Sequence, residues 1–297
     1  MKPLLKVAEG TLPNVGIFLS GSGSNAEMLL KTVRALPKPV MNIAVLVTDA
    51  PLTSRARELG RMFNVPVAEL DIKQFYADRG ETRVSIATEA GQRIREEWTN
   101  ELRRLIAPYK LDFAVFAGFV PLTNISSDFP CLNVHPGDLT YLKDGKRLLV
   151  GLHTIPIENA IVEGLDYMRS SVIIVETYSG SGKEMDNGLL LGISPKVRIE
   201  FAGHSRAELA GCIPLRPAKR PKGGYGDIME SVASDNQGLL KENGDWIVLP
   251  QVVIQFASGN YAVDDDGTLL FRENGSFTRI RTVEFSNRGV SQILREE

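Results

Sequence analysis

The stretch Leu132-Asn133-Val134-His135-Pro136 places two polar side chains at the end of an apolar, strand-like run. Asn133 and His135 are two residues apart, so on a strand they point to the same face. Pro136 cannot extend a central strand, so the pair is expected where the strand stops. In an open parallel sheet, ligands bind beyond the carboxyl ends of the strands. An amide beside an imidazole suits a reaction in which negative charge develops on an oxygen. A strand end whose polar groups only bind loop backbone fits this stretch equally well.

Apolar runs alternate with amphipathic stretches around this motif. Strands are predicted at residues 15–19, 43–47, 113–117 and 172–175, and helices at residues 26–35, 54–63, 83–107 and 155–162. A strand–helix–strand order implies parallel pairing with right-handed crossovers. The pattern therefore predicts an α/β fold with a parallel sheet.

A glycine-rich loop, Ser20-Gly21-Ser22-Gly23-Ser24-Asn25, joins the first predicted strand to its helix. This order directs backbone N–H groups and a helix N-terminus at an anion. The loop lacks the Gly-Lys-Ser/Thr ending of a P-loop and the full Gly-x-Gly-x-x-Gly fingerprint. A phosphate-binding loop and a tight turn are both compatible with it.

Composition narrows the functional classes. The 297-residue chain has 43% hydrophobic and 24% charged residues and a formal net charge of −2, which argues against general binding to nucleic acid or anionic membranes. Its apolar runs are strand-sized, and residues 1–10 do not have the pattern of a secretory signal. Two cysteines and three histidines without metal-ligand spacing predict neither a disulfide framework nor a metal site. We expect a cytoplasmic protein; the sequence gives no indication of its oligomeric state.

The C-terminal part carries a predicted helix at residues 227–241, an apolar run at 252–256 and a hairpin. The hairpin pairs residues 261–263 with 269–271 across Asp265-Asp266-Gly267. We expect a single domain over residues 1–297, with a core at about 13–203 and residues 227–280 packing back on it as helix and hairpin.

Several motifs together resemble the folate-dependent formyltransferases, and among them the phosphoribosylglycinamide formyltransferases. The motifs follow the family's order over most of the chain: residues 20–25, Ala117-Gly118-Phe119-Val120, residues 133–136, Gly151-Leu152-His153-Thr154 and Asp186-Asn187-Gly188, with a weaker similarity from Leu249-Pro250-Gln251-Val252-Val253-Ile254 to Gly275. The resemblance implies a three-layer, open, mostly parallel sheet with helices on both faces, the formyltransferase fold, with a C-terminal hairpin extension.

The resemblance also implies an activity, the transfer of a formyl group from 10-formyltetrahydrofolate to the primary amine of glycinamide ribonucleotide in purine biosynthesis. Attack of the amine gives a tetrahedral intermediate that carries an oxyanion. Asn133 would donate a hydrogen bond to that oxygen. His135 would do the same and help to move a proton, and Asp186 would orient or charge the imidazole and order a water that relays the proton.

Binding residues follow from the same resemblance. Gly21, Ser22, Gly23, Ser24 and Asn25 would hold the acceptor phosphate, and Asp245 falls where the family has a glutamate that touches the acceptor. Phe119, Val120 and Leu122 would line the apolar pocket for the folate pterin, although ordinary core packing explains each of them equally well. The implied partners are therefore a phosphate-bearing amine and the folate donor, with no metal.

Three departures from the family pattern leave the acceptor open. The central motif continues as His135-Pro136-Gly137-Asp138-Leu139-Thr140, and the segment up to Gly151 is longer than usual. Ile173 stands where the family commonly has a histidine, and an isoleucine cannot donate a hydrogen bond. The loop before Asp186 is also long. An enzyme of the same fold that uses another amine acceptor, such as an amino sugar nucleotide, is therefore an alternative. A hydrolase that passes the formyl group to water and a non-catalytic ligand-binding relative are two others.

Overall fold

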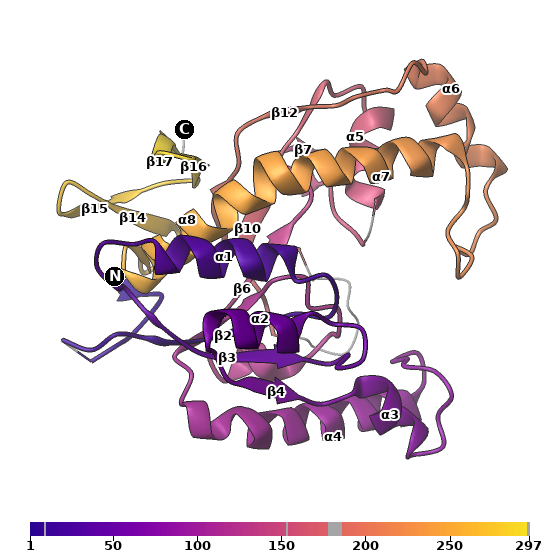
Figure 1. Ribbon diagram of the computed structural model, residues 1–297. Helices are drawn as coiled ribbons and strands as arrows, with labels where there is room; N and C mark the ends of the chain where they lie inside the picture. The colour runs from indigo at the N-terminus through magenta and orange to yellow at the C-terminus, as the bar shows by residue number, and fades with distance from the viewer. Residues whose placement is uncertain (9, 153, 178–185, 296–297) are drawn as a thin grey trace.

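An open, mostly parallel sheet forms the centre of the protein (Figure 1). The computed structural model describes residues 1–8, 10–152, 154–177 and 186–295. In this part of the chain, one sheet contains nine strands. In spatial order they are β17 (Gly289–Leu294), β16 (Thr282–Ser286), β11 (Leu190–Ile193), β10 (Ser171–Ile174), β6 (Cys131–His135), β5 (Phe113–Phe116), β2 (Asn14–Phe18), β3 (Asn42–Thr48) and β4 (Val67–Glu69).

The pairing directions fix the position of the site. Strands β4, β3, β2, β5 and β6 run parallel, so their carboxyl ends meet at one edge. Strand β10 is antiparallel to β6 and begins at that edge, with Ser171 opposite His135 and Ile173 opposite Asn133. The chain order reverses direction between β2 and β5, which is where open α/β sheets bind ligands.

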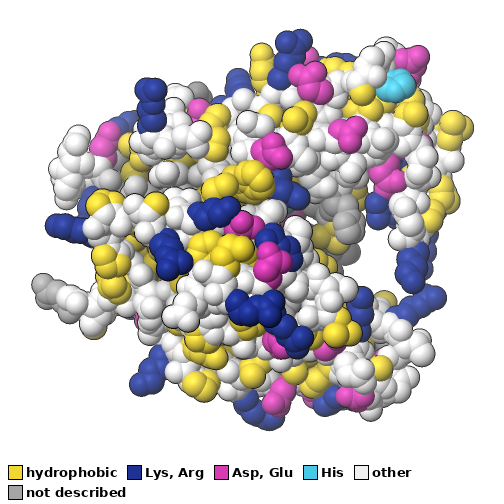
Figure 2. Space-filling view, in the orientation of Figure 1, with side chains coloured by type: hydrophobic (Ala, Val, Ile, Leu, Met, Phe, Trp, Pro, Cys, Tyr) yellow, Lys and Arg dark blue, Asp and Glu magenta, His cyan; other side chains and the backbone are white. Residues whose placement is uncertain are grey.

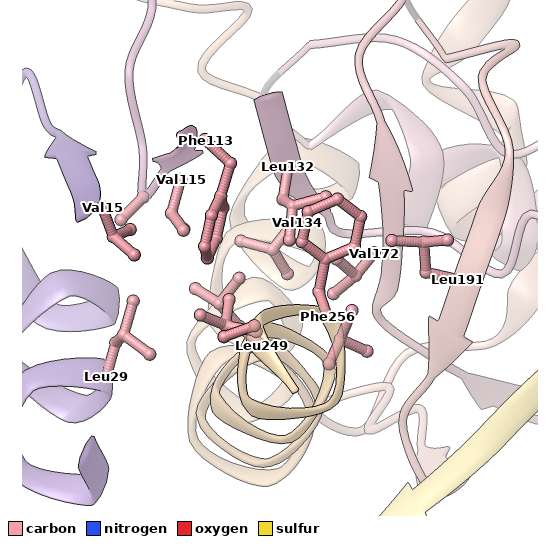
Figure 3. Packing of buried hydrophobic residues seen from close by; sticks show 14 of the residues in the cluster. Val15, Leu29, Phe113, Val115, Leu132, Val134, Val172, Leu191, Leu249 and Phe256 are labelled. Atoms are coloured by element: carbon pink, nitrogen blue, oxygen red, sulfur yellow. The ribbon is translucent and has the colours of Figure 1, made fainter. Parts of the chain in front are cut away.

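Helices cover both faces of the sheet. The helices are α1 (Ser24–Arg34), α2 (Ala56–Phe63), α3 (Ile72–Ala77), α4 (Glu89–Ile106), α5 (Ile155–Val162), α6 (Arg206–Gly211), α7 (Ile228–Leu240) and α8 (Trp246–Ala257). Side chains of α1, α2 and α8 pack on one face, and those of α3 and α4 on the other. Figure 3 shows residues of the first of these cores, among them Leu132 and Val134 of β6, around α8. Alternation along β6 therefore leaves Asn133 and His135 on the opposite face.

Helix α4 is shorter than the predicted helix at residues 83–107. It begins at Glu89 because the Thr88 hydroxyl accepts a hydrogen bond from the N–H of Gly91, which caps the first turn. Its buried face is formed by Ile94, Trp98, Leu102 and Ile106, one turn apart.

A third hydrophobic cluster lies outside the sheet layers. It joins α5, α6 and α7 with two short strands, β9 (Tyr167–Met168) and β12 (Val197–Arg198). These three helices form a lobe apart from α1–α4 in Figure 1, and Figure 2 shows the surface hollowed between this lobe and the layer of α3 and α4. Leu149 is buried in the lobe's core, so the segment after His135 is anchored there.

The C-terminal elements return to the sheet. After α7, a π-helical turn, η4 (Lys241–Asp245), leads into α8. The predicted hairpin is confirmed as β13 (Tyr261–Val263) paired with β14 (Leu269–Glu273). It forms a small sheet with β1 (Lys2–Pro3) and β15 (Ser276–Arg279). The described residues also form three short 3₁₀ turns, η1 (Ala107–Tyr109), η2 (Asn124–Ser127) and η3 (Ile213–Leu215), and a two-stranded hairpin of β7 (Leu142–Lys143) and β8 (Lys146–Arg147).

Candidate active site

His135 and Asp186, which are far apart in the sequence, lie together at the carboxyl end of β6. His135 Nδ1 is 3.4 Å from Asp186 Oδ1, and the His135 side chain is almost fully buried. This distance is an ion-pair contact and is longer than a typical hydrogen bond. Catalytic contacts are often long before substrate binds. The two residues are therefore close enough to act on the same proton.

The other ring nitrogen of His135 also faces an oxygen atom. Nε2 is 2.7 Å from the carbonyl oxygen of Leu149. A carbonyl can only accept, so Nε2 carries the hydrogen in this arrangement. Both nitrogens of the imidazole thus face oxygen atoms of the protein.

The side chain of Asn133 lies on the same face of β6 as His135 and is half-buried. Within the described part of the chain, it forms no hydrogen bond with another residue. Its amide N–H groups are therefore available to a ligand oxygen.

The segment after His135 supplies residues that the sequence analysis missed. Residues 142–147 form a hairpin of β7 (Leu142–Lys143) and β8 (Lys146–Arg147). Arg147 donates through Nη1 to the carbonyl oxygens of Asp186 and Gly188, the latter at 3.0 Å. The N–H of Gly151 donates to Asp186 Oδ2 at 3.1 Å. The dipeptide Asp144-Gly145 was the signal for this hairpin, because it favours a tight turn with positive φ at both positions.

The glycine loop presents free backbone donors at the start of α1. Gly23 is the N-terminal cap residue, with φ of 63°, and the structure has no side-chain cap there. Any Cβ at this position would lie 2.9 Å from side-chain atoms of Leu19 and Leu59, so a glycine is required. Among the described residues, the N–H groups of residues 21–25 have no protein acceptor. Uncapped donors at a helix N-terminus form an anion-binding site.

Asp245 joins the glycine loop to the rest of the site. Its carboxylate accepts hydrogen bonds from Asn25 Nδ2 at 2.9 Å and from the Ser170 hydroxyl at 2.5 Å. Burial raises the pKa of the Asp245 carboxyl, and these two hydrogen bonds together with the charges of Lys241 and His135 oppose the rise. The structure therefore brings Asn25, Asp245 and His135 into one region.

The three residues predicted for the folate pocket lie after β5 in different environments. The ring of Phe119 packs among Phe18, Phe116 and Trp98, which is the behaviour of a core residue. The side chain of Val120 is 69% exposed. Arg95 holds the carbonyl oxygen of Leu122 at 2.7 Å, and Ser20 Oγ accepts a hydrogen bond from the Val120 N–H at 2.9 Å. The backbone of this segment is thus fixed beside the glycine loop, and Val120 is open to a ligand.

Ile173 lies opposite Asn133 and is fully buried with Leu139, Leu190 and Ile193. An apolar wall therefore borders the polar pair at the position where the resembling family commonly has a histidine.

Other observations bear on binding within the described residues. In the described ranges, no group of three His, Cys, Asp or Glu side chains is arranged to hold a metal ion. None of the described helices is long and apolar enough to cross a membrane. His153 and most of the loop before Asp186, including Ser179, lie outside the described residues.

Comparison with solved structures identifies the fold, and it is that of the formyltransferases. The chain superposes on the phosphoribosylglycinamide formyltransferase of Coxiella burnetii in complex with CHES with a TM-score of 0.58 and 16% identity, over 93% of this chain and 100% of that chain. The phosphoribosylglycinamide formyltransferase of Anaplasma phagocytophilum gives a TM-score of 0.55 and 17% identity, over 91% of this chain and 98% of that chain. Glycinamide ribonucleotide transformylase 1 from Symbiobacterium toebii gives a TM-score of 0.53 and 17% identity, over 88% of this chain and 95% of that chain.

These matches confirm the predicted fold class, and they confirm the resemblance at the level of fold. No family model and no curated protein matches the chain by sequence. At this identity the likeness establishes the fold alone, so the reaction has to be argued from the site.

Proposed function

We propose that this protein transfers a formyl group from 10-formyltetrahydrofolate to the primary amine of glycinamide ribonucleotide. The observation that carries the proposal is the contact between His135 and Asp186 at the carboxyl end of β6, beside Asn133, whose side chain has no hydrogen-bond partner among the described residues. These are the residue types that the reaction needs, since a negative charge forms on the formyl oxygen and a proton must leave the attacking amine.

The contacts of the site favour a division of roles. Asn133 has no described partner, so its amide is the donor that we assign to the formyl oxygen. His135 and Asp186 face one another, and we assign them to the proton that passes from the amine to the folate nitrogen as the carbon–nitrogen bond to the folate breaks. General acid–base assistance contributes about 10²- to 10⁴-fold to such a step, and one oxyanion donor about 10²- to 10³-fold.

The glycine loop supports a phosphate-bearing acceptor. Its N–H groups are unpaired within the described residues and lie at an uncapped helix N-terminus, where the helix dipole favours negative charge. Asp245, which the resemblance assigns to the acceptor, is held by Asn25 of this loop and by Ser170.

The segment after β5 fits a folate ring. It offers an exposed apolar side chain, Val120, on a backbone held by Ser20 and Arg95. In this proposal the segment binds and orients the donor that carries the formyl group, while Asn133, His135 and Asp186 handle the charge and the proton.

A second candidate is the transfer to another amine or to water. The segment from Gly137 to Val150 differs from the family pattern beside the reaction centre, and both oxygens of the Asp245 carboxylate already accept hydrogen bonds. Either feature would change the shape of the acceptor that fits. An amino sugar nucleotide or water would then replace glycinamide ribonucleotide.

The deciding experiment is an assay with a 10-formylfolate analogue, with and without glycinamide ribonucleotide, that follows release of the deformylated folate. Release that requires the ribonucleotide is the expected result. Release without any acceptor would assign a hydrolase instead. Binding of the folate without release, in the presence of the ribonucleotide, would overturn the proposed acceptor and direct the search to amino sugar nucleotides.

A further inference from the structure

The segment after His135, which departs from the pattern of the formyltransferases, also holds His135 and Asp186 in place. Within five residues, three groups contact the pair His135 and Asp186: the guanidinium of Arg147, the carbonyl oxygen of Leu149 and the N–H of Gly151. Arg147 fixes the Asp186 backbone, Gly151 fixes the Asp186 carboxylate, and Leu149 fixes the imidazole. Each of the two side chains is therefore held from the same stretch of chain.

This stretch is itself anchored at several points. The hydroxyl of Tyr141 and the ammonium of Lys143 both donate to Glu163, at 3.0 Å and 2.7 Å, just after α5. The N–H of Leu139 donates to the Ser171 hydroxyl at 3.0 Å, opposite His135 in the sheet. The side chain of Leu149 is buried in the core of the helical lobe while its carbonyl oxygen faces His135. Residues 139–149 are therefore fixed both to the sheet and to the helical lobe, and they contact the site from this fixed position.

The geometry at Gly137 shows how closely the segment approaches the imidazole. A Cβ at this position would lie 2.3 Å from the carbonyl oxygen of Leu149 and 2.8 Å from His135 Nε2. Only a glycine leaves room for the carbonyl to reach the ring. The glycine and the inserted hairpin are therefore parts of one arrangement.

Arg147 is suited to its place for a physical reason. One guanidinium nitrogen donates to two carbonyl oxygens of the turn that carries Asp186, and an arginine keeps its charge at any ordinary pH, so both contacts are permanent. Partial burial lowers the pKa of the guanidinium, and the carboxylates of Asp186 and Glu176 counteract this. The Arg147 guanidinium is thus partly removed from water where it contacts the backbone of Asp186 and Gly188.

We propose that Arg147 is a positioning residue, and that the hairpin of residues 142–147 is a brace that sets Asp186 against His135. The kinetic part of this inference rests on the formyl transfer proposed above. The structural part, the effect of Arg147 on His135, does not depend on which reaction is catalysed.

The test uses the full chain in three forms: wild type, Arg147→Ala and the matched control Lys146→Ala. Lys146 is the exposed neighbour of Arg147 on the same strand, so the control removes a positive charge from the hairpin without touching Asp186. Steady-state formyl transfer gives kcat and both KM values. Nitrogen-15 NMR of labelled histidine reports the ring nitrogens of His135 among three histidines, with the assignment made from His135→Gln.

For Arg147→Ala we expect kcat to fall by about 10- to 100-fold, the scale of a reacting group misplaced by about 1 Å, while both KM values change much less. The ring signals of His135 should shift in this variant and stay in place in Lys146→Ala. Wild-type kcat and unshifted ring signals in Arg147→Ala would overturn the inference. Equal losses in Arg147→Ala and Lys146→Ala would also do so, because they would reflect hairpin charge alone.

Two further outcomes keep the inference and the proposed function separable. If wild type transfers no formyl group but the His135 signals shift in Arg147→Ala, the brace stands and the proposed function fails. If Arg147→Ala does not fold, Arg147→Met decides, since it keeps a long apolar stem and lacks the N–H donors. Reduced kcat with shifted ring signals in Arg147→Met supports the brace, and wild-type values in both measurements overturn it.

Discussion

The two carboxylates of the proposed site are supported in different ways. Asp245, on what we call the acceptor side, links helix α1 to the turn before α8, whereas Asp186, on what we call the reaction side, is held by loop backbone. Asp245 ends the π-helical turn before α8 and bonds to Asn25 in the first turn of α1, and α1 and α8 pack together in the main core. Asp186 bonds to Gly151, and its backbone to Arg147, in a segment outside the sheet.

This difference in support predicts different responses to mutation. A change on the acceptor side disturbs a contact between two helices that pack in the main core, so it should appear first in stability. A change on the reaction side disturbs the placement of His135 and Asp186, to which we assign the proton transfer, so it should appear first in rate. Precise placement that comes from a polar brace is also easier to lose than placement that comes from a packed core.

The largest effect should come from the reaction side itself. His135→Ala and Asp186→Asn should each reduce kcat for formyl transfer by about 10²- to 10⁴-fold, because each removes one member of the proton-handling pair. Thermal unfolding should still show a cooperative transition, since neither residue belongs to the main hydrophobic core. Near-wild-type turnover in purified His135→Ala would remove the pair from the mechanism.

A smaller effect is expected where the brace meets the imidazole. Gly137→Ala places a methyl group 2.3 Å from the Leu149 carbonyl oxygen, so the segment must move. Overpacking of this kind costs about 1–3 kcal/mol in the free energy of unfolding, which denaturant titration measures, and kcat should fall with it.

Gly238→Ala is the matched control for this substitution. A Cβ at Gly238 has no neighbour within 4 Å in the described structure, and the residue lies in α7. The same chemical change should therefore be neutral or stabilise the protein by up to about 1 kcal/mol. Equal destabilisation by both substitutions would argue against a tight contact at Gly137.

The sequence alone predicted the central strands of the sheet, because they are short, continuous apolar runs, such as residues 113–117, and such runs are typical of buried parallel strands. It also predicted that a strand ends at Asn133 and His135 before a proline, which β6 confirms, whereas their role in a site stays a prediction. The contact of His135 with Asp186 came from the family resemblance, because local patterns carry no information about which two loops meet.

Other parts were missed for physical reasons. The hairpin of residues 142–147 is short and its strands are polar, so only Asp144-Gly145 indicated it. Periodicity does not distinguish a buried helix from a buried strand in the apolar run at residues 252–256, which lies in α8. The edge strands β16 and β17 pair with distant parts of the chain or with each other, and their mixed polar pattern did not indicate this. The placement of Phe119, Val120 and Leu122 as folate contacts stays a prediction.

The smallest effect should appear on the acceptor side as a pH dependence of stability. Burial raises the pKa of Asp245 above its ordinary value of 3.8. A carboxyl whose native pKa is raised contributes stability that is fully present below its unfolded pKa, and this contribution is lost as the pH rises through the native pKa. Asp245→Asn removes the titration. Wild-type stability minus that of Asp245→Asn should therefore fall as the pH rises above about 4, by about 1.4 kcal/mol for each unit between the two pKa values.

The carboxamide can be accommodated because Asn25 Oδ1 is buried and has no partner in the described structure. When the side-chain amide of Asn25 flips by 180°, its Oδ1 accepts a hydrogen bond from the side-chain amide introduced by Asp245→Asn. The contact between α1 and the start of α8 is then kept. Asp235→Asn, at an exposed position of α7, is the control and should give a difference that does not fall in this way. Urea unfolding of the three proteins between pH 4 and pH 8 measures both differences. A constant difference for Asp245→Asn would mean that its carboxylate is as well solvated as an exposed one, and the acceptor side would then not be held by a buried charge.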